Sequence, residues 1–79
     1  MDSLKKLQQL VEEGDTFETH LTDSKILHLY NDSGHYIAIN YDQSEESFRI
    51  DGIKSPGEYF SHCCRSAEDA RDWITAIDA

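Results

Sequence analysis

The chain has 79 residues, of which 38% are hydrophobic and 10% are aromatic, and its formal net charge at pH 7 is −9. This length allows one domain with a modest core, and the apolar content is too high for a disordered acidic tail. Because 16 acidic residues face 7 basic ones, direct binding to nucleic acid or to anionic membrane is disfavoured. We therefore expect a single folded domain over residues 1–79.

The first expected element is a helix over residues 3–13. Its hydrophobic residues recur on one helical face: Leu4, Leu7, Leu10 and Val11. Asp2 or Ser3 can cap its start, and Gly14 stands where a left-handed residue often ends a helix. Its lysines lie near the positive end of the helix dipole and its glutamates near the negative end, so we expect tertiary packing to hold this helix in place.

A change to period two, with Thr, Tyr, Ile and Phe enriched, predicts strands between Thr16 and Cys64. The pattern gives five of them: 16–21, 25–31, 35–41, 47–51 and 58–64. Turn residues separate these strands: Thr22-Asp23-Ser24, Asp32-Ser33-Gly34, Asp42 to Glu46, and Ser55-Pro56-Gly57. The Pro-Gly pair predicts a type II turn, and connections this short predict antiparallel neighbours.

The turn at Asp32-Ser33-Gly34 predicts the register of the hairpin around it. If Gly34 is left-handed in a three-residue loop, Tyr30 pairs with Tyr36. The same register collects four aliphatic residues on one face: Leu27, Leu29, Ile37 and Ile39. A slip by one residue would mix them with polar side chains, so this register is favoured. The other face is mixed and aromatic, and we expect it to be half solvated.

The last segment predicts a second helix over residues 67–78. Ser66 is placed to cap it, and the acidic side chains of Glu68 and Asp69 fall in its first turn, where the helix dipole favours negative charge. A buried stripe follows at helical spacing: Ala70, Trp73, Ile74 and Ile77. The expected fold class is α+β, with one antiparallel sheet of five strands, a helix at each end of the chain, and both helices on one face.

The segment His62-Cys63-Cys64-Arg65 raises the possibility of a metal or thiol site. In a strand the two cysteine side chains point to opposite faces, so they do not chelate one ion together. A zinc site from His62, Cys64 and a cross-strand His28 would lack a fourth ligand and the usual ligand spacing. We interpret one cysteine as a small core residue, and we expect no catalytic residues, no metal and no cofactor.

Two family resemblances bear on function. The segment EYFSHCCRSAEDARDWITAID, about a quarter of the chain, resembles the last strand and closing helix of a pleckstrin homology domain. The chain is short for that barrel, begins with a helix, and lacks the basic strand-loop-strand that would hold a phosphoinositide headgroup.

The whole chain resembles the small phage-encoded inhibitors known as anti-CRISPR proteins. The likeness is architectural and compositional: a leading helix, a small antiparallel sheet with the hairpin segment NDSG, an acidic loop and a strong negative charge. Several members of that family occupy the nucleic-acid site of a bacterial effector. The resemblance implies carboxylates that meet Lys or Arg of a partner, at Asp32, Asp42, Glu45, Glu46 and Asp51, with Tyr30 and Tyr36 as less polar anchors. Alternatively, the tyrosines only support the hairpin.

Two acidic stretches are relevant to such a function. In the first no basic residue interrupts Glu12, Glu13, Asp15 and Glu18, and in the second only Arg49 relieves Asp42, Glu45, Glu46 and Asp51. A strand advances about 6.6–6.8 Å per two residues, near the phosphate repeat of nucleic acid, so strand carboxylates can imitate its backbone. The alternative is that the acids only keep the protein soluble.

These features predict a non-enzymatic acidic protein that inhibits a basic nucleic-acid-handling partner. The alternative is a generic bacterial or mobile-element interaction module, acting through its open sheet face or as a homodimer. The start MDSLKKLQQLVEEG has no apolar core of the kind found in secretory signals, and two adjacent cysteines make no disulfide framework. We therefore expect a cytoplasmic protein of a bacterial host, binding neither nucleic acid nor membrane, as a monomer or homodimer.

Overall fold

The computed structural model describes residues 3–23, 25–54 and 57–77. Within these residues the chain forms a helix, five strands and a second helix: α1 (Ser3–Gly14), β1 (Glu18–Thr22), β2 (Ile26–Tyr30), β3 (Tyr36–Asp42), β4 (Ser47–Lys54), β5 (Glu58–Cys64) and α2 (Ala67–Ile77). This order confirms the predicted α+β fold class. Neither described helix is long and apolar enough to cross a membrane.

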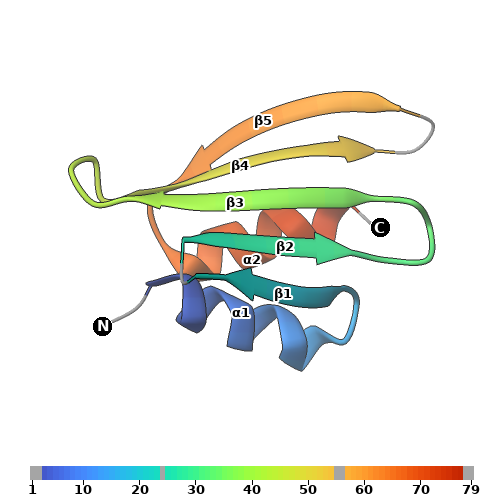
Figure 1. Ribbon diagram of the computed structural model, residues 1–79, viewed down its shortest axis with the longest axis horizontal. Helices are drawn as coiled ribbons and strands as arrows, with labels where there is room; N and C mark the ends of the chain where they lie inside the picture. The colour runs from blue at the N-terminus through green and yellow to red at the C-terminus, as the bar shows by residue number, and fades with distance from the viewer. Residues whose placement is uncertain (1–2, 24, 55–56, 78–79) are drawn as a thin grey trace.

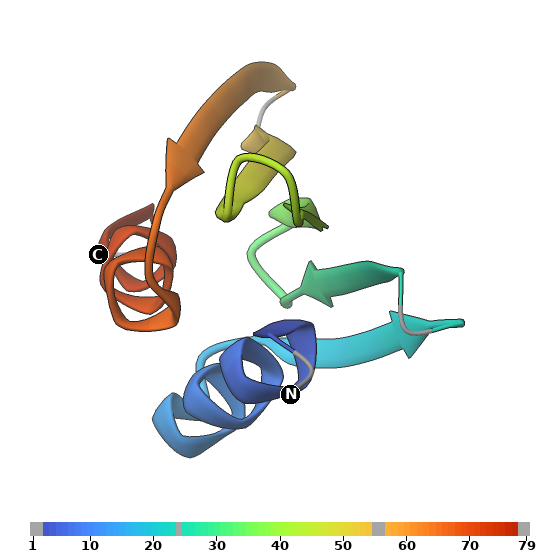
Figure 2. The same ribbon diagram turned by 90° about the vertical axis from the view of Figure 1, so that its left-hand side faces the viewer.

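The five strands form one antiparallel sheet in the order β1-β2-β3-β4-β5 (Figure 1). The sheet is strongly curled, and both helices lie on its concave side (Figure 2). Helix α1 contacts β1, β2 and β3, helix α2 contacts β4 and β5, and the two helices contact each other. The prediction that both helices cover one face is therefore confirmed, and neither described helix lies over the opposite, convex face.

The hydrophobic core fills the space between the helices and the concave face. Its members come from both helices, the sheet and the connection before β1: Leu4, Leu7, Val11, Phe17, Leu27, Leu29, Ile37, Ile39, Phe48, Ile50, Cys64, Ala67, Ala70 and Ile74. Along the strands buried and more exposed residues alternate, as one-sided coverage requires. Burying a Leu or Ile side chain stabilises a fold by about 1.5–3 kcal/mol. The aliphatic face of the sheet therefore turns toward the helices.

The hairpin between β2 and β3 has the predicted register. Tyr30 pairs with Tyr36 and Leu29 with Ile37, and Gly34 has a φ of 87°. The Gly34 N–H donates to the carbonyl of Asn31 at 3.2 Å. The Asn31 side-chain oxygen also accepts backbone N–H groups from within the loop, so the loop is held by its own polar groups.

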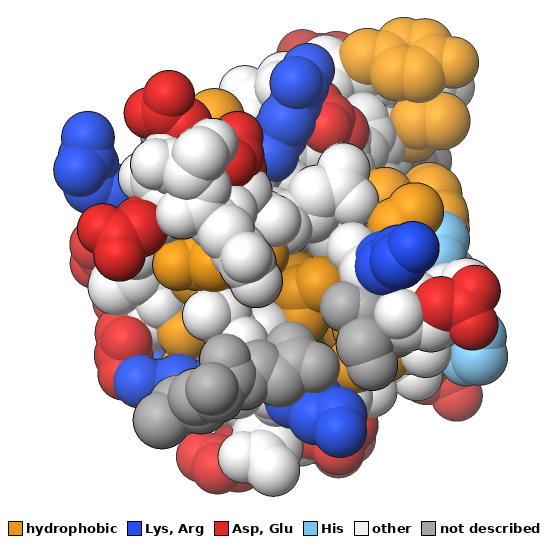
Figure 3. All heavy atoms as spheres, turned by 60° about the vertical axis from the view of Figure 1, so that its left-hand side comes forward, with side chains coloured by type: hydrophobic (Ala, Val, Ile, Leu, Met, Phe, Trp, Pro, Cys, Tyr) orange, Lys and Arg blue, Asp and Glu red, His pale blue; other side chains and the backbone are white. Residues whose placement is uncertain are grey.

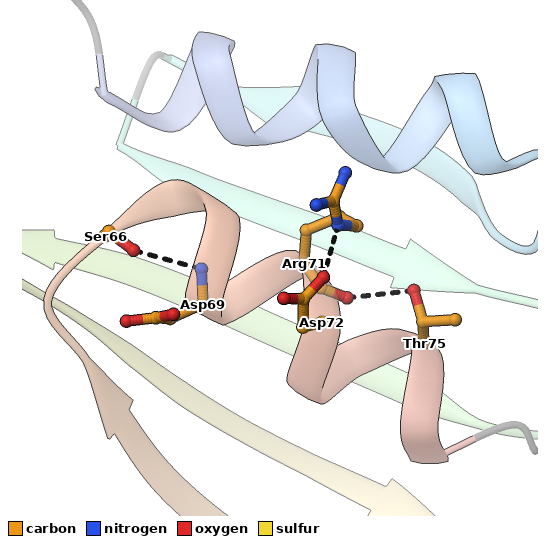
Figure 4. Close-up of polar contacts among 5 residues, drawn as sticks. All are labelled: Ser66, Asp69, Arg71, Asp72 and Thr75. Atoms are coloured by element: carbon orange, nitrogen blue, oxygen red, sulfur yellow. Dashed lines mark hydrogen bonds and ion pairs between the residues drawn. The ribbon is translucent and has the colours of Figure 1, made fainter.

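Helix α2 begins with the predicted cap. The Ser66 hydroxyl oxygen accepts the N–H of Asp69 at 3.0 Å (Figure 4). Farther along, the Thr75 hydroxyl donates to the carbonyl of Arg71 at 2.9 Å, and the Arg71 guanidinium contacts Asp72 at 2.7 Å. The cap satisfies a backbone donor that the helix itself leaves without a partner.

Some element boundaries differ from the predicted ones. Strand β4 continues through Gly52 to Lys54, because its pairing with β3 and β5 overrides the weak strand preference of glycine. The left-handed residue after α1 is Asp15, with a φ of 54°, and not Gly14. Parts of the predicted caps, turns and helix end fall at Asp2, Ser24, Ser55, Pro56 and Asp78, which lie outside the described residues.

Candidate binding surface

The structure separates the predicted partner-binding residues into three locations. Asp32 lies in the β2–β3 turn, whereas Asp42, Glu45 and Glu46 lie around the β3–β4 turn at the opposite end of the sheet (Figure 1). Strand β3 between these turns has seven residues, so they stand about 20 Å apart. Asp51, Tyr30 and Tyr36 lie on the convex face, because their side chains alternate with those of the buried strand residues.

A second acidic segment lies beside Asp32. The connection from α1 to β1 and the β2–β3 turn meet at one end of the sheet, where they line a depression of about 220 Å³. Its carboxylates are those of Asp15, Glu18 and Asp32, and none of the described residues that line it is basic. All three are exposed. We call these three residues the acidic end.

Helix α1 and strand β1 hold this connection in place through a chain of side-chain hydrogen bonds. The Gln8 amide donates to the Thr19 hydroxyl oxygen at 3.1 Å, and the Thr19 hydroxyl donates to the carboxylate of Glu12 at 2.9 Å. The Asp15 N–H donates to the carbonyl of Glu12 at 3.1 Å. Asp tolerates the left-handed backbone better than most residues, so the chain can turn here and carry a carboxylate at the turn.

The predicted tyrosines lie next to the acidic end on the convex face. Tyr30 pairs with Glu18 across β1 and β2, and with Tyr36 across β2 and β3. Tyr30 is 44% exposed and Tyr36 is 40% exposed. The Tyr36 hydroxyl shares a 2.5 Å hydrogen bond with Nδ1 of His28, whose ring stacks on Tyr36. Two partly exposed aromatic side chains thus border the carboxylates.

At the opposite end, Asp42 has a structural role in its own turn. Its Oδ1 accepts the hydroxyl of Ser44 at 2.7 Å and the backbone N–H groups of Ser44 and Glu45. These hydrogen bonds, the one from the Ser44 hydroxyl most strongly, hold the pKa of Asp42 below its ordinary value. The turn gains this stabilisation above the ordinary pKa and loses it as the pH falls through the lowered one.

Charges of both signs surround that turn. A depression of about 770 Å³ is lined by Asp42 and Glu45 but also by Arg49 and Arg65. Figure 3 shows acidic and basic side chains interspersed on the face that includes this end. On the convex face, Nε of Arg49 lies 3.3 Å from the carboxylate of Asp51. The basic side chains partly cancel the negative field of this second group of carboxylates.

The residues of the His62-Cys63-Cys64 segment are divided between the two faces of the sheet. Cys64 is buried in the core and Cys63 is exposed. His62 lies on the concave side, where its ring stacks on Trp73 of α2 with a centroid distance of 4.6 Å. His28 lies on the convex face, so it does not join His62 and Cys64 in a site. Among residues 3–23, 25–54 and 57–77, no three His, Cys, Asp or Glu side chains are grouped to hold a metal ion.

The two cysteines should differ in their reaction with a thiol reagent. Burial, and then the negative charges of Asp69 and Cys63, raise the pKa of the Cys64 thiol. We expect iodoacetamide to label the exposed Cys63 of the native protein quickly and the buried Cys64 only on unfolding. Intact-mass measurement follows both reactions. The Cys63→Ser variant should lose the fast phase. Equal rates for both thiols in the native protein would contradict the burial of Cys64.

Sequence reasoning missed the pairing of the first acidic stretch with Asp32. In a sheet whose neighbouring strands are antiparallel, the turn after β2 lies at the same end as the start of β1, and this signal was available. Tyr59, which is 80% exposed, was also missed. It lies in the same cross-strand row as Tyr30 and Tyr36, because Ile53 pairs with Tyr36 on one side and with Tyr59 on the other.

Comparisons with known proteins find no matching family model, curated protein or solved structure.

Proposed function

We propose that the protein is a non-enzymatic inhibitor that binds a basic, nucleic-acid-handling partner through its acidic end. One observation carries the proposal: Asp15 before β1, Glu18 at the start of β1 and Asp32 in the β2–β3 turn line one depression, and no basic residue is among the described residues that line it. Carboxylates grouped in this way offer a cationic groove the negative charge that a nucleic-acid backbone would bring. We further propose that it acts in the cytoplasm of a bacterial host.

The neighbouring tyrosines support this proposal. Carboxylates alone speed association and favour a basic surface, but exposed charge pairs contribute little affinity. Tyr30 and Tyr36 add apolar area next to the acidic end, and tyrosine is among the residues that contribute most at protein interfaces. On this basis the acidic end steers the partner, and the tyrosines hold it.

The proposal predicts that removing the negative charge of the acidic end strongly reduces capture of the partner. A triple variant with Asp15→Asn, Glu18→Gln and Asp32→Asn is immobilised, exposed to bacterial lysate at low salt, and eluted with rising salt. Wild-type protein should release a basic nucleic-acid-binding protein as the salt rises. Added single-stranded nucleic acid should also release this protein, because it competes for the same basic site. The triple variant should capture at least about tenfold less of it, because the like-for-like amides remove charge and little else.

A matched control removes the same charge from the opposite end of the sheet. It combines Asp23→Asn, Glu45→Gln and Glu46→Gln, and leaves the structural Asp42 intact. This variant should capture the partner as well as the wild type. If it loses the partner while the acidic-end variant keeps it, then the β3–β4 turn is the binding site. If neither variant differs from the wild type, the acids serve only solubility and the proposal is wrong.

The alternative function, binding through the open sheet face, is favoured by the uncovered convex face. That face exposes Tyr30, Tyr36 and Tyr59 in one cross-strand row. Partner binding by apolar contact there would depend weakly on ionic strength, whereas binding by charge falls steeply. A partner that resists salt elution, and is lost on Tyr30→Ser with Tyr36→Ser but not with the acidic-end variant, would favour this alternative.

A further inference from the structure

Strand β5 forms one edge of the sheet and carries few of the features that guard such edges. Strand β1 forms the other edge and has five residues, whereas β5 has seven. Edge strands expose unpaired backbone groups, and proteins usually protect them with charged residues, proline, bulges or short length. From Tyr59 to Cys64 the strand has no charged residue and no proline. Figures 1 and 2 show β5 at the outer edge of the sheet, with none of the other described helices or strands along its far side.

Apolar side chains flank this edge on both faces of the sheet. On the convex face Tyr59 is 80% exposed. On the concave face Phe60 contacts Trp73 of α2, with a centroid distance of 5.2 Å, and both are only partly buried. With Glu58 and Ile77 these two rings line a depression of about 180 Å³ at the edge. The open backbone and the apolar surface on both sides of it form a single surface suited to another strand.

We infer that this edge pairs with the β5 edge of a second copy of the chain, antiparallel and about a twofold axis at Ser61. An edge that meets its own copy must be self-complementary. In this register Tyr59 lies opposite the partner's Cys63, and Phe60 lies opposite the partner's His62. Each protomer's apolar flank on the concave side then covers that of the other. The two sheets become one continuous ten-stranded sheet.

The charges at the two ends of β5 favour the antiparallel direction. Glu58 begins the strand and Arg65 follows its last residue. In antiparallel pairing each Glu58 lies near the partner's Arg65, so opposite charges are close together. In parallel pairing each Glu58 would lie near the same residue of the partner, so like charges would be close together. A stable interface buries at least about 1,000 Å² in total, so the flanking side chains of Tyr59, Phe60 and Trp73 are needed in addition to the strand backbone.

The dimer and the proposed acidic binding function respond to salt in opposite directions. Each protomer has a net charge of −9, so two copies repel each other, and screening by salt weakens this repulsion. We expect the dimer to tighten between low and moderate salt, where capture of a basic partner weakens. The acidic-end variant should dimerise at least as well as the wild type, so either idea can fail without the other.

Sedimentation equilibrium over a concentration series, at low and at moderate salt, tests the dimer. The wild type should show a monomer–dimer equilibrium. Ser61→Glu places two carboxylates opposite each other across the axis and should weaken the dimer at least about tenfold. The matched control is His20→Glu, an exposed residue of the same cross-strand row on the other edge strand, which should leave the equilibrium unchanged. A wild type that stays monomeric throughout, or equal weakening by both variants, would overturn the inference.

Cross-linking tests the register directly. In a Cys63→Ser background, Ser61→Cys places two thiols in directly opposed positions, where Cα atoms lie about 4.5–5.5 Å apart, and mild oxidation should join the two chains. Tyr59→Cys in the same background places its two thiols about 13 Å apart and should give no cross-linked dimer. A cross-link through position 59 and none through position 61 would show that the strands pair in a different register, against the twofold axis at Ser61.

Discussion

Replacing Gly52 with alanine should destabilise the fold by about 3 kcal/mol, because the added methyl group has no room. A Cβ atom at this position would lie 2.5 Å from the carbonyl oxygen of Tyr36 and 2.5 Å from Cζ of Phe60. The carbonyl belongs to the backbone of β3, which pairs with β4, and the Phe60 ring is already held against Trp73. Relief of the clash therefore requires the strands to separate or the aromatic contact to break.

Urea unfolding followed by circular dichroism measures this loss as a lower midpoint with an unchanged slope. Gly14→Ala is the control. A Cβ there meets only the Thr16 hydroxyl oxygen, at an ordinary 3.8 Å, and Gly14 is the last residue of α1. This substitution should be neutral or stabilise the fold by up to about 1 kcal/mol. Equal stability of both variants would show that the strands accommodate the methyl group without cost.

Leu7→Ala should cost between about 2 and 5 kcal/mol, the range measured for buried leucines that leave a cavity. Leu7 is fully buried in the middle of α1. The helix has no acidic residue in its first turn and no basic residue in its last, so the dipole interactions that stabilise other helices are missing. Because its isolated stability is low, α1 depends on this packing more than a well-capped helix would.

Gln9→Ala on the exposed side of α1 is the matched control, and it should change the free energy of unfolding by less than about 0.5 kcal/mol. Hydrogen exchange of the β3 amides gives a second measurement. If α1 leaves the sheet locally, Leu7→Ala should lower protection in α1 more than in β3. An equal loss of stability in Gln9→Ala and Leu7→Ala, or no loss of stability in Leu7→Ala, would contradict the packing of α1 described above.

Local sequence signals predicted the hairpin between β2 and β3 correctly. The turn at Asp32-Ser33-Gly34 and the aliphatic alternation on either side of it both require the same register. The Ser66 cap was predictable for the same reason, since it depends on an oxygen and an N–H three residues apart. The strand lengths of β1 and β4 were less well predicted, because they depend on pairing with neighbours that a local pattern does not specify.

The candidate surface was only partly predictable. The acidic stretch around Asp15 and Glu18 is evident in the sequence, but its proximity to Asp32 depends on the direction of strands between them. The structural role of Asp42 depends on the three hydrogen bonds it accepts in its turn. Composition alone does not distinguish an aspartate that accepts such hydrogen bonds from one that is only solvated. Likewise, the stacking of His62 on Trp73 depends on how α2 crosses the sheet.

Strand order in this sheet follows chain order, so each strand pairs only with its neighbours in the sequence. Such local pairing favours rapid refolding, because little loop-closure entropy precedes each hairpin. The contact between α1 and α2 is different, since it joins segments separated by the whole sheet. During synthesis, therefore, the hairpins can assemble as they leave the ribosome, but the interior surface beneath α2 stays open to water, and to chaperones, until that helix has emerged.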